Sequence, residues 1–158
     1  LLPMAKDLGL TVSCDIQDVV SAGDAYRKDF VEYADILFFS TVNQPRPAAV
    51  METFLQANPR QIVVAGMGAR GCALGTSVEG VRFFDPIVME TPVVDANGAG
   101  DGLAVGFLTS FVLDNYSLSD AVLRGQIAAR HTCTQKATSS HLITPEKLDH
   151  YFKRLMRR

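Results

Sequence analysis

Two short, almost wholly apolar runs, Asp35–Ser40 and Gln61–Ala65, constrain the fold of this chain more than any other feature. A strand with apolar side chains on both faces is typical of a parallel sheet that helices cover on both sides. A helix pattern at Arg27–Ala34 precedes the first run, and Pro47 opens a second helix between the two runs. With a β-rich run at Thr11–Asp15, this alternation predicts an α/β domain with a mainly parallel sheet.

The alternation ends after the second apolar run. Two short β-patterns, Cys72–Gly75 and Val81–Phe84, flank a turn at Ser77–Gly80 and predict an antiparallel hairpin. Beyond the hairpin we expect three helices: one from about Asp101 to Asn115, one after Ser117 or Ser119, and one with Thr144 as N-cap and Pro145 as its first residue.

Charge and composition exclude several classes of partner. The net charge is −2, so no basic surface is available to attract the phosphates of nucleic acid. No apolar run reaches the ~20 residues that span a bilayer, so we expect no membrane partner. Cys14, Cys72 and Cys133 show no Cys-x-x-Cys spacing, which disfavours disulfides and zinc sites and is typical of the reducing cytoplasm. His131 and His141 lack the spacing and the nearby carboxylates of a metal site.

Nine of the 12 glycines lie between Gly66 and Gly106, so close approach of the backbone to a ligand is concentrated in one stretch. The first cluster, Gly66–Gly71, matches G-x-G-x-x-G and follows a predicted strand. A dinucleotide-binding fingerprint would need its third glycine to open a helix, but a short β-pattern follows here. We therefore set the dinucleotide interpretation aside. A plain corner between two strands and a loop that lines a nucleotide in another fold both stay open.

The second cluster, Asn97-Gly98-Ala99-Gly100-Asp101, follows the strand-like pair Val93-Val94 and leads directly into an amphipathic helix. Small residues let the backbone approach a ligand closely, and the first N–H groups of a helix have no partner within it. Such N–H groups stabilise the charge of a transferring phosphoryl group, while a carboxylate beside them accepts the proton of the attacking hydroxyl. On the local sequence alone, however, Asp101 as a plain helix cap is the stronger interpretation.

The wider pattern changes that interpretation. The segment Val94–Leu108 closely resembles the second signature of the ribokinase (PfkB) family of sugar and nucleoside kinases, Asp-Thr-x-Gly-Ala-Gly-Asp followed by a helix with Gly-Phe-Leu. Three further segments resemble the family in the same order along the chain: Asp15-Ile-Gln17 its Asp-x-Asn, Asp35-Ile-Leu37 one of its strands, and Val63–Gly71 its Thr-Leu-Gly-x-x-Gly. The resemblance implies a ribokinase-like three-layer α/β/α fold.

The resemblance also implies a reaction and a set of site residues. The reaction is transfer of the ATP γ-phosphoryl group, with Mg²⁺, to a hydroxyl of a sugar or nucleoside. The implied residues are Asp101 as catalytic base, Gly98, Ala99 and Gly100 as anion hole, Gly68, Gly71, Asn97 and Gln126 at ATP, and Asp95 at a monovalent cation such as K⁺. No side chain is expected to serve as a dedicated metal ligand. For Gln126 an ordinary polar helix position, and for Asp95 a brace of the loop, are equally open.

The chain departs from the family pattern at three places. Ala96 replaces a Thr within the loop, and Gly66 replaces the Thr of Thr-Leu-Gly, so a hydroxyl that could contact the nucleotide is absent. The family's Asn-x-x-Glu, which helps to organise magnesium and phosphate, aligns with Ser40-Thr-Val-Asn43, which has no Glu. Metal binding there is either weakened or supplied by water. These departures keep a rival interpretation open, a non-catalytic nucleotide-binding module or degenerate kinase.

The resemblance implies that residues 1–158 are the C-terminal part of one ribokinase-like domain. In that family the residues that bind the acceptor sugar and the lid lie mainly in the N-terminal half, and Leu2–Leu8 looks like the end of a helix whose start is absent. We therefore expect this chain alone to hold nucleotide phosphates and to phosphorylate little or nothing. The identity of the acceptor and the oligomeric state, a homodimer included, stay open.

Overall fold

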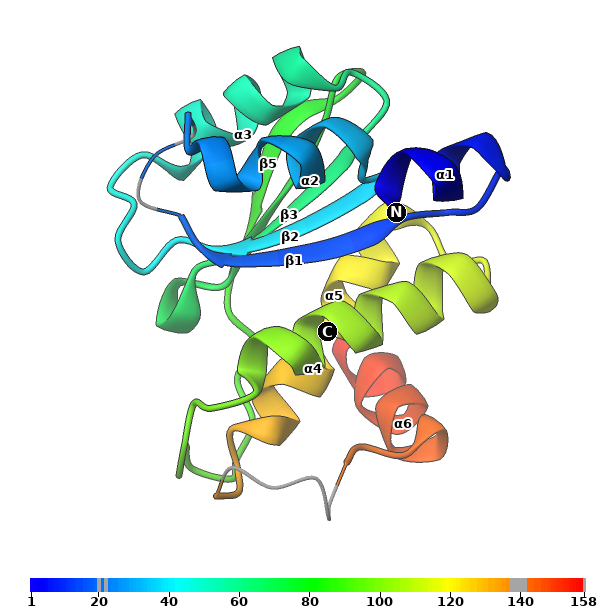
Figure 1. The fold of residues 1–158 in the computed structure, drawn as a ribbon. Coiled ribbons are helices and arrows are strands. Elements are labelled where there is room, and N and C mark those ends of the chain that lie inside the picture. The colour runs from blue at the N-terminus through cyan, green and yellow to red at the C-terminus, as the bar shows by residue number, and fades with distance from the viewer. Residues whose placement is uncertain (20, 22, 137–141, 158) are drawn as a thin grey trace. The chain divides into compact units, whose positions relative to one another are not determined.

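The chain folds into two compact units, Leu1–Asp85 and Pro86–Arg158, each of which is described here by itself. Figure 1 shows the computed structural model, which describes residues 1–19, 21, 23–136 and 142–157. His141 lies outside the described residues. The first unit contains a five-stranded sheet with helices, and the second unit is helical.

The sheet of the first unit has the strand order β1-β2-β3-β4-β5. β1 pairs with β2, and β2 with β3, in parallel, whereas β4 is antiparallel to both β3 and β5, so β4 alone is reversed. The mainly parallel sheet and the hairpin are thereby confirmed. The strands are β1 (Ser13–Asp18), β2 (Ile36–Ser40), β3 (Ile62–Gly66), β4 (Cys72–Thr76) and β5 (Gly80–Phe84).

Three helices accompany this sheet: α1 (Leu2–Asp7), α2 (Lys28–Tyr33) and α3 (Pro47–Ala57). Figure 1 shows α2 and α3 on the same side of the sheet. Side chains from both helices share one buried cluster with alternate residues of the central strands, because alternate residues of a strand point to the same face. Members of this cluster include Leu37 and Phe39 of β2, Met51, Phe54 and Leu55 of α3, and Val63 of β3.

The central strand β2 is buried along its apolar length, as its composition predicts. Residues Ile36 to Phe39 are each at most 3% exposed. The predicted β3 began at Gln61, but the strand begins one residue later. The side-chain amide of Gln61 instead donates to the carbonyl oxygens of Val31 and Ala34, at 2.9 Å each, and so connects the end of α2 to the sheet.

The second unit is built from α4 (Ala99–Leu108), a π-helical turn at Thr109–Leu113, α5 (Leu118–Thr132) and α6 (Pro145–Leu155). The predicted first helix is therefore wrong in its bounds, since it starts two residues before Asp101 and its last turn is π-helical. The other two helix starts are confirmed. The side chain of Ser117 accepts the N–H of Asp120, and that of Thr144 accepts the N–H of Lys147.

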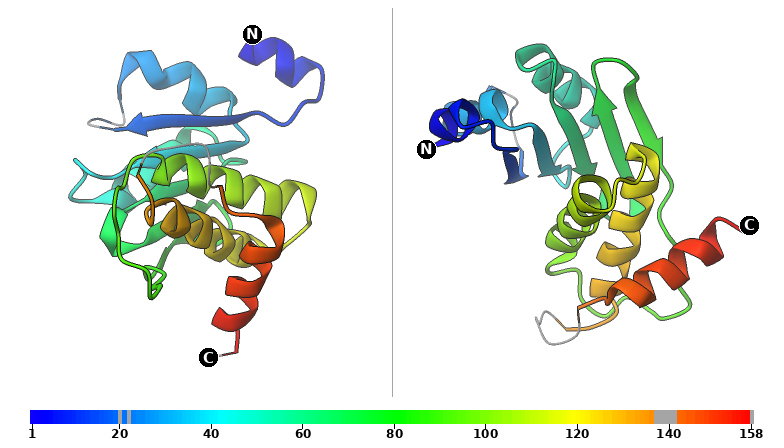
Figure 2. Two further views of the ribbon diagram at one scale, coloured as in Figure 1. Left: turned by 90° about the horizontal axis from the view of Figure 1, so that it is seen from below. Right: turned by 90° about the vertical axis from the view of Figure 1, so that its right-hand side faces the viewer.

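α4 and α5 lie side by side and antiparallel, and glycines set their separation (Figure 2). A Cβ on Gly106 would lie 2.8 Å from the Cβ of Ala128, and one on Gly125 would lie 2.7 Å from the carbonyl oxygen of Leu103. A Cβ on Gly102 would lie 2.8 Å from the hydroxyl of Thr132. These distances are shorter than normal contacts, so the two helices approach closely only because glycine stands at all three positions.

A buried arginine connects α5 to the π-helical turn and to α6. Arg124 is 3% exposed, and its Nε donates to the hydroxyl of Ser110 at 2.8 Å, while Nη1 donates to Asp149 at 2.6 Å. The guanidinium carbon lies 4.2 Å from the ring centre of Tyr116 and 5.3 Å from that of Phe152. Burial of this charge is compensated by an acid, a hydroxyl and two aromatic faces, so the three helical segments are fixed to one another.

All three cysteines are free thiols. Burial raises the pKa of Cys72 to about 12, so its thiolate is scarce at neutral pH and the residue serves as a small apolar core side chain. None of the helices in the described part of the chain combines the length and the apolar character that crossing a bilayer requires.

We predict that Gly125→Ala destabilises the protein by about 1–3 kcal/mol, because the added methyl group overpacks the contact between α4 and α5. Urea unfolding measures the loss. Gly23→Ala is the control, because the nearest heavy atom to its new Cβ is the Ser21 hydroxyl, 3.9 Å away. An equal effect of the two substitutions would contradict the packing argument.

Candidate active site

The segment before the glycine loop is not a strand, contrary to the prediction for Val93-Val94. Both side chains are exposed, Val93 at 61% and Val94 at 56%. The N–H groups of Val94 and Asp95 donate to the carbonyl oxygen of Cys133, at 2.7 and 3.3 Å, at the C-cap of α5. These hydrogen bonds of the segment therefore go to a helix end and not to a neighbouring strand.

Local hydrogen bonds then turn the chain into α4. The carboxylate of Asp95 accepts the N–H of Asn97 at 3.0 Å, and the carbonyl oxygen of Ala96 accepts the N–H of Ala99 at 3.2 Å. Gly98 is the N-cap, with φ +78° in the left-handed region that glycine adopts without steric cost. The hydrogen bond of Asp95 agrees with the bracing role that the sequence left open.

The first turn of α4 offers backbone donors to a ligand. Within the described residues, the N–H groups of Gly100 and Asp101 have no hydrogen-bond acceptor. The alternative in which Asp101 caps the helix is wrong, because Gly98 is the N-cap and no side chain caps this end. Asp101 is instead an exposed carboxylate in the first helical turn, beside the unpartnered N–H groups. A helix start with free N–H groups is suited to bind an anion.

The other predicted phosphate loop lies in the first unit, at the corner between β3 and β4. A 3₁₀ turn at Gly68–Arg70 forms this corner, and Gly68 and Gly71 have φ of +59° and +88°. The N–H of Met67 donates to the carbonyl oxygen of Gly71 at 2.9 Å. β4 follows Gly71 directly, as the sequence predicts, so the third glycine of this cluster does not open a helix. A role of this corner at a nucleotide stays a prediction.

Gln126 occupies a buried position on α5. The residue is 7% exposed, and its side-chain nitrogen has no hydrogen-bond partner within the described residues. A buried donor without an acceptor is costly, so this amide is the part of Gln126 that a ligand or water would satisfy. His131, on the same helix, is buried beside Gln135, with 3.5 Å between the two side-chain nitrogens.

Sequence reasoning missed a polar group at the carboxyl ends of β1 and β2. The side-chain nitrogen of Asn43 donates to Oδ2 of Asp18, and the other oxygen, Oδ1, is buried without a hydrogen-bond partner within the described residues. A β-bulge in β1 places Asp18 opposite Ser40. Such a bulge follows from strand pairing, so no pattern of residues in β1 alone could have revealed it.

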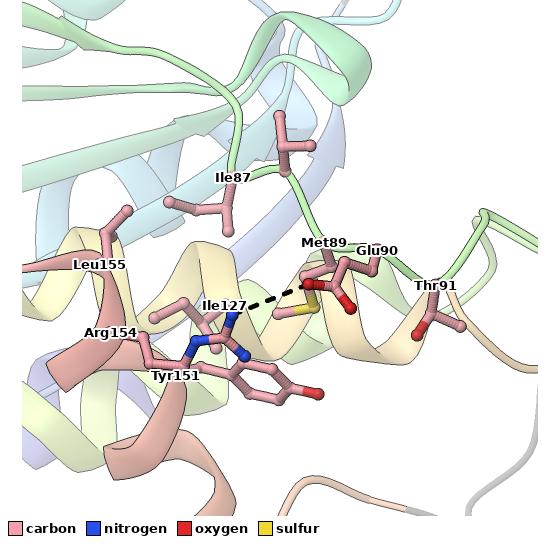
Figure 3. A pocket seen from close by; sticks show the side chains of 9 residues that line it. Ile87, Met89, Glu90, Thr91, Ile127, Tyr151, Arg154 and Leu155 are labelled. Carbon is pink, nitrogen blue, oxygen red and sulfur yellow. Dashed lines mark ion pairs between the residues drawn. The ribbon is translucent and has the colours of Figure 1, made fainter. Parts of the chain in front are cut away.

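The second unit also contains a small hollow between the segment 87–91 and helices α5 and α6 (Figure 3). Its volume is about 150 Å³, and an ion pair of Glu90 and Arg154, 3.7 Å apart, stands at its rim. Ligand pockets usually enclose about 300–1,000 Å³, so the hollow is too small for a nucleotide. None of the predicted site residues lines it; its lining residues are Ile87, Val88, Met89, Glu90, Thr91, Ile127, Tyr151, Arg154 and Leu155.

Comparison with known proteins shows which family this chain resembles. Residues 28–145 match the model of the pfkB family carbohydrate kinases. Acarbose 7(IV)-phosphotransferase of an Actinoplanes species is 33% identical over 139 residues, which are 87% of this chain and 46% of that protein.

Solved structures agree in fold. A microbiome-derived acarbose kinase superposes with a TM-score of 0.88 at 26% identity, over 96% of this chain and 51% of that one. An E. coli protein assigned as ribokinase II, solved with ATP and Mg²⁺, superposes with a TM-score of 0.79 at 17% identity, over 97% of this chain and 52% of that one. The chain thus has the ribokinase-like α/β fold and spans about half the length of these relatives.

We predict that Gly98→Ala lowers the free energy of unfolding by about 1–2 kcal/mol, because the Cβ of alanine is sterically unfavourable in the left-handed conformation of this N-cap. Gly80→Ala is the matched control, because Gly80 has φ +72° at the start of β5. Both variants should lose similar stability in urea unfolding, but only Gly98→Ala should shift the amide resonances of Gly100 and Asp101. Unchanged stability of Gly98→Ala would contradict the left-handed N-cap.

Proposed function

Because the chain belongs to the pfkB family of carbohydrate kinases, we propose that it carries the ATP-binding and catalytic groups of an enzyme that transfers the ATP γ-phosphoryl group to a sugar-like or nucleoside hydroxyl. One observation carries the proposal: a single turn of α4 combines two unpartnered N–H groups with an exposed carboxylate. The names of two relatives, a phosphotransferase and a kinase of acarbose, support a carbohydrate acceptor.

Asp101 is the proposed general base. Its carboxylate accepts the proton of the acceptor hydroxyl as that oxygen forms its bond to the γ-phosphorus, and the bond from this phosphorus to the bridging oxygen of ADP breaks. The products are ADP and a phosphate ester of the acceptor. Exposure of Asp101 supports this role, because an acceptor can reach the carboxylate directly.

The start of α4 is the proposed anion hole. The N–H groups of Gly100 and Asp101 donate to the phosphoryl oxygens, and the N-cap Gly98 with Ala99 lets the backbone approach them. The positive end of the helix dipole adds to the same effect. Each such donor contributes on the order of 10²–10³ in rate when its position matches the charge of the transition state.

The remaining ATP contacts are proposals with unequal support. Gly68 and Gly71 have the open backbone of a loop that a nucleotide can approach, and Asn97 adjoins the anion hole. Gln126 has an amide nitrogen in need of an acceptor, which a purine ring nitrogen can supply. For Asp95, a K⁺ site is proposed beside its bracing hydrogen bond to Asn97.

Magnesium, which prefers oxygen ligands, would fit at the carboxyl ends of β1 and β2, where the Asp18 carboxylate lies with Ser40 opposite it in the sheet and accepts a hydrogen bond from Asn43. When bound, Mg²⁺ neutralises charge on the phosphates of ATP. The relative solved with ATP and Mg²⁺ supports this cofactor pair for the family fold. Orientation of the phosphates is then the task of the chain itself, and we assign it to the N–H groups of the anion hole.

We predict that Asp101→Asn lowers kcat by about 10²–10⁴-fold, because the amide cannot accept the proton. ATP affinity should be nearly unchanged, since the N–H groups of the anion hole remain. Coupled ADP release with a panel of acarbose, ribose and nucleosides measures turnover of the full-length protein, and calorimetry measures ATP binding. Asp85→Asn is the control, because it removes an exposed carboxylate at the end of the first unit.

Two outcomes would contradict the kinase proposal. Full turnover by Asp101→Asn would show that Asp101 is not the general base. A parent protein that binds ATP and phosphorylates no member of the panel would favour the non-catalytic module, which the missing acid at Ser40–Asn43 already motivates.

We also propose that residues 1–158 form the C-terminal part of one kinase domain, because Val94–Leu108 resembles the second signature of the family and the chain spans only 46% of the phosphotransferase and 51% of the acarbose kinase. The 158 residues alone are then expected to release almost no sugar-dependent ADP. The assay compares the chain with the full-length protein, after circular dichroism has shown that both are folded. A normal rate from the chain alone would refute this division of the domain.

A further inference from the structure

We propose that Asp18 supplies the carboxylate that faces the Mg²⁺ of bound Mg·ATP, in place of the acid that Ser40–Asn43 lacks. This inference rests on the proposed function and deepens it, because it assigns a metal-facing role to a residue outside the family-like motifs. Four features of the first unit support it. They are a bulge in β1, two hydrogen bonds from Arg27 to the backbone of β1 (the Arg27 bracket), one oxygen of the Asp18 carboxylate that accepts a hydrogen bond, and a second oxygen that has no partner within the described residues.

The bulge brings Asp18 to its position. Asp15 pairs with Phe38, and Asp18 pairs with Ser40, so three steps along β1 match two steps along β2. A regular ladder would have placed Gln17 opposite Ser40. One extra residue therefore re-aims β1 and puts the carboxylate beside the start of Ser40–Asn43.

The bulge contains a sterically strained residue, which is typical of functional sites. Gln17 has φ +60°, a left-handed conformation that is sterically unfavourable for a residue other than glycine. The carboxylate of Asp15 stabilises this turn by accepting the N–H of Gln17 at 2.8 Å. Strained residues of this kind persist where the surrounding structure fixes them, and they cluster at functional sites.

Arg27 binds two backbone carbonyl groups in the irregular part of β1. Its Nη2 donates to the carbonyl oxygen of Asp18 at 2.8 Å, and its Nε donates to that of Ile16 at 3.1 Å. The guanidinium also pairs with Asp24, which compensates its positive charge. The backbone at Asp18 is therefore held in place by contacts that do not involve the Asp18 carboxylate.

The two oxygens of the Asp18 carboxylate differ. Oδ2 accepts a hydrogen bond from the side-chain nitrogen of Asn43, the residue that stands where the family pattern has its acid. Oδ1 is buried and has no hydrogen-bond partner within the described residues. A buried carboxylate oxygen with no donor is costly, and a cation or an ordered water at that oxygen would account for it.

The chemistry favours magnesium at this place. The described residues contain no group of three or more His, Cys, Asp and Glu side chains that could hold a metal by themselves. Mg²⁺ does not need such a cage, because it usually binds one or two carboxylates, several waters and the phosphates of its nucleotide. Ligands of open α/β sheets bind outside the carboxyl ends of parallel strands, which is where Asp18 lies.

Calorimetry of a non-hydrolysable ATP analogue, with and without Mn²⁺ as stand-in for Mg²⁺, tests the inference in the full-length protein. In the parent, Mn²⁺ should strengthen analogue binding by about tenfold or more, since even outer-shell partners of metal ligands contribute 10–100-fold. Asp18→Asn should lose most of this gain. It should bind the metal-free analogue at least as tightly as the parent, because a carboxylate repels bare phosphates.

Three further variants make the test specific. Asp29→Asn, which removes an exposed acid of α2, should keep the full Mn²⁺ effect. Asp18→Asn combined with Asn43→Asp moves the carboxylate across the hydrogen bond and should restore the effect. Asn43→Asp alone should enlarge it and lower the unfolding temperature in metal-free buffer, because two acids then face each other.

An unchanged Mn²⁺ effect in Asp18→Asn overturns the inference. If that variant does not fold, an unchanged effect in Asn43→Asp overturns it instead. The proposed function fails separately, when the parent releases no ADP with any acceptor but still shows the Mn²⁺ effect and its dependence on Asp18. A parent that binds no analogue with or without Mn²⁺ overturns both.

Discussion

The close contact between α4 and α5 is the constraint on which the candidate site depends. Gly102, Gly106 and Gly125 leave no room for a Cβ between the two helices, so their backbones touch at several levels. A helix held in this way has little freedom to tilt, and its first turn carries the unpartnered N–H groups. Asp101 is thereby fixed to a rigid element, which is what positioning of a reacting hydroxyl requires.

The two halves of the proposed chemistry obtain their backbone geometry by different means. At the start of α4 the left-handed residue is Gly98, for which that conformation carries no steric penalty. At the end of β1 it is Gln17, for which the penalty is real, and an Asx turn and the Arg27 bracket offset it. The strained backbone at Gln17 is the more informative of the two. A glycine at this position, or a regular strand ladder, would have avoided the strain.

The sequence predicted most of the fold because the determining signals are local. The apolar runs of β2 and β3 and the N-caps Ser117 and Thr144 act over a few residues, and the structure confirms them. The strand prediction for Val93-Val94 was wrong because β-propensity does not reveal whether a partner strand is present. Here the C-cap of α5 accepts the hydrogen bonds instead. Asp18 escaped notice for the same reason, since strand register is a property of two strands together.

The groups that we propose to react are not enclosed. Gly98, Gly100 and Asp101 are exposed, and the hollow beside α6 is too small for a nucleotide. Electrostatic stabilisation of a phosphoryl group is far stronger once water is excluded, because the local dielectric constant then falls. In the proposed mechanism the donors at α4 act at full strength only when substrate covers them, so acceptor binding and proton transfer to Asp101 are coupled by the same exclusion of water.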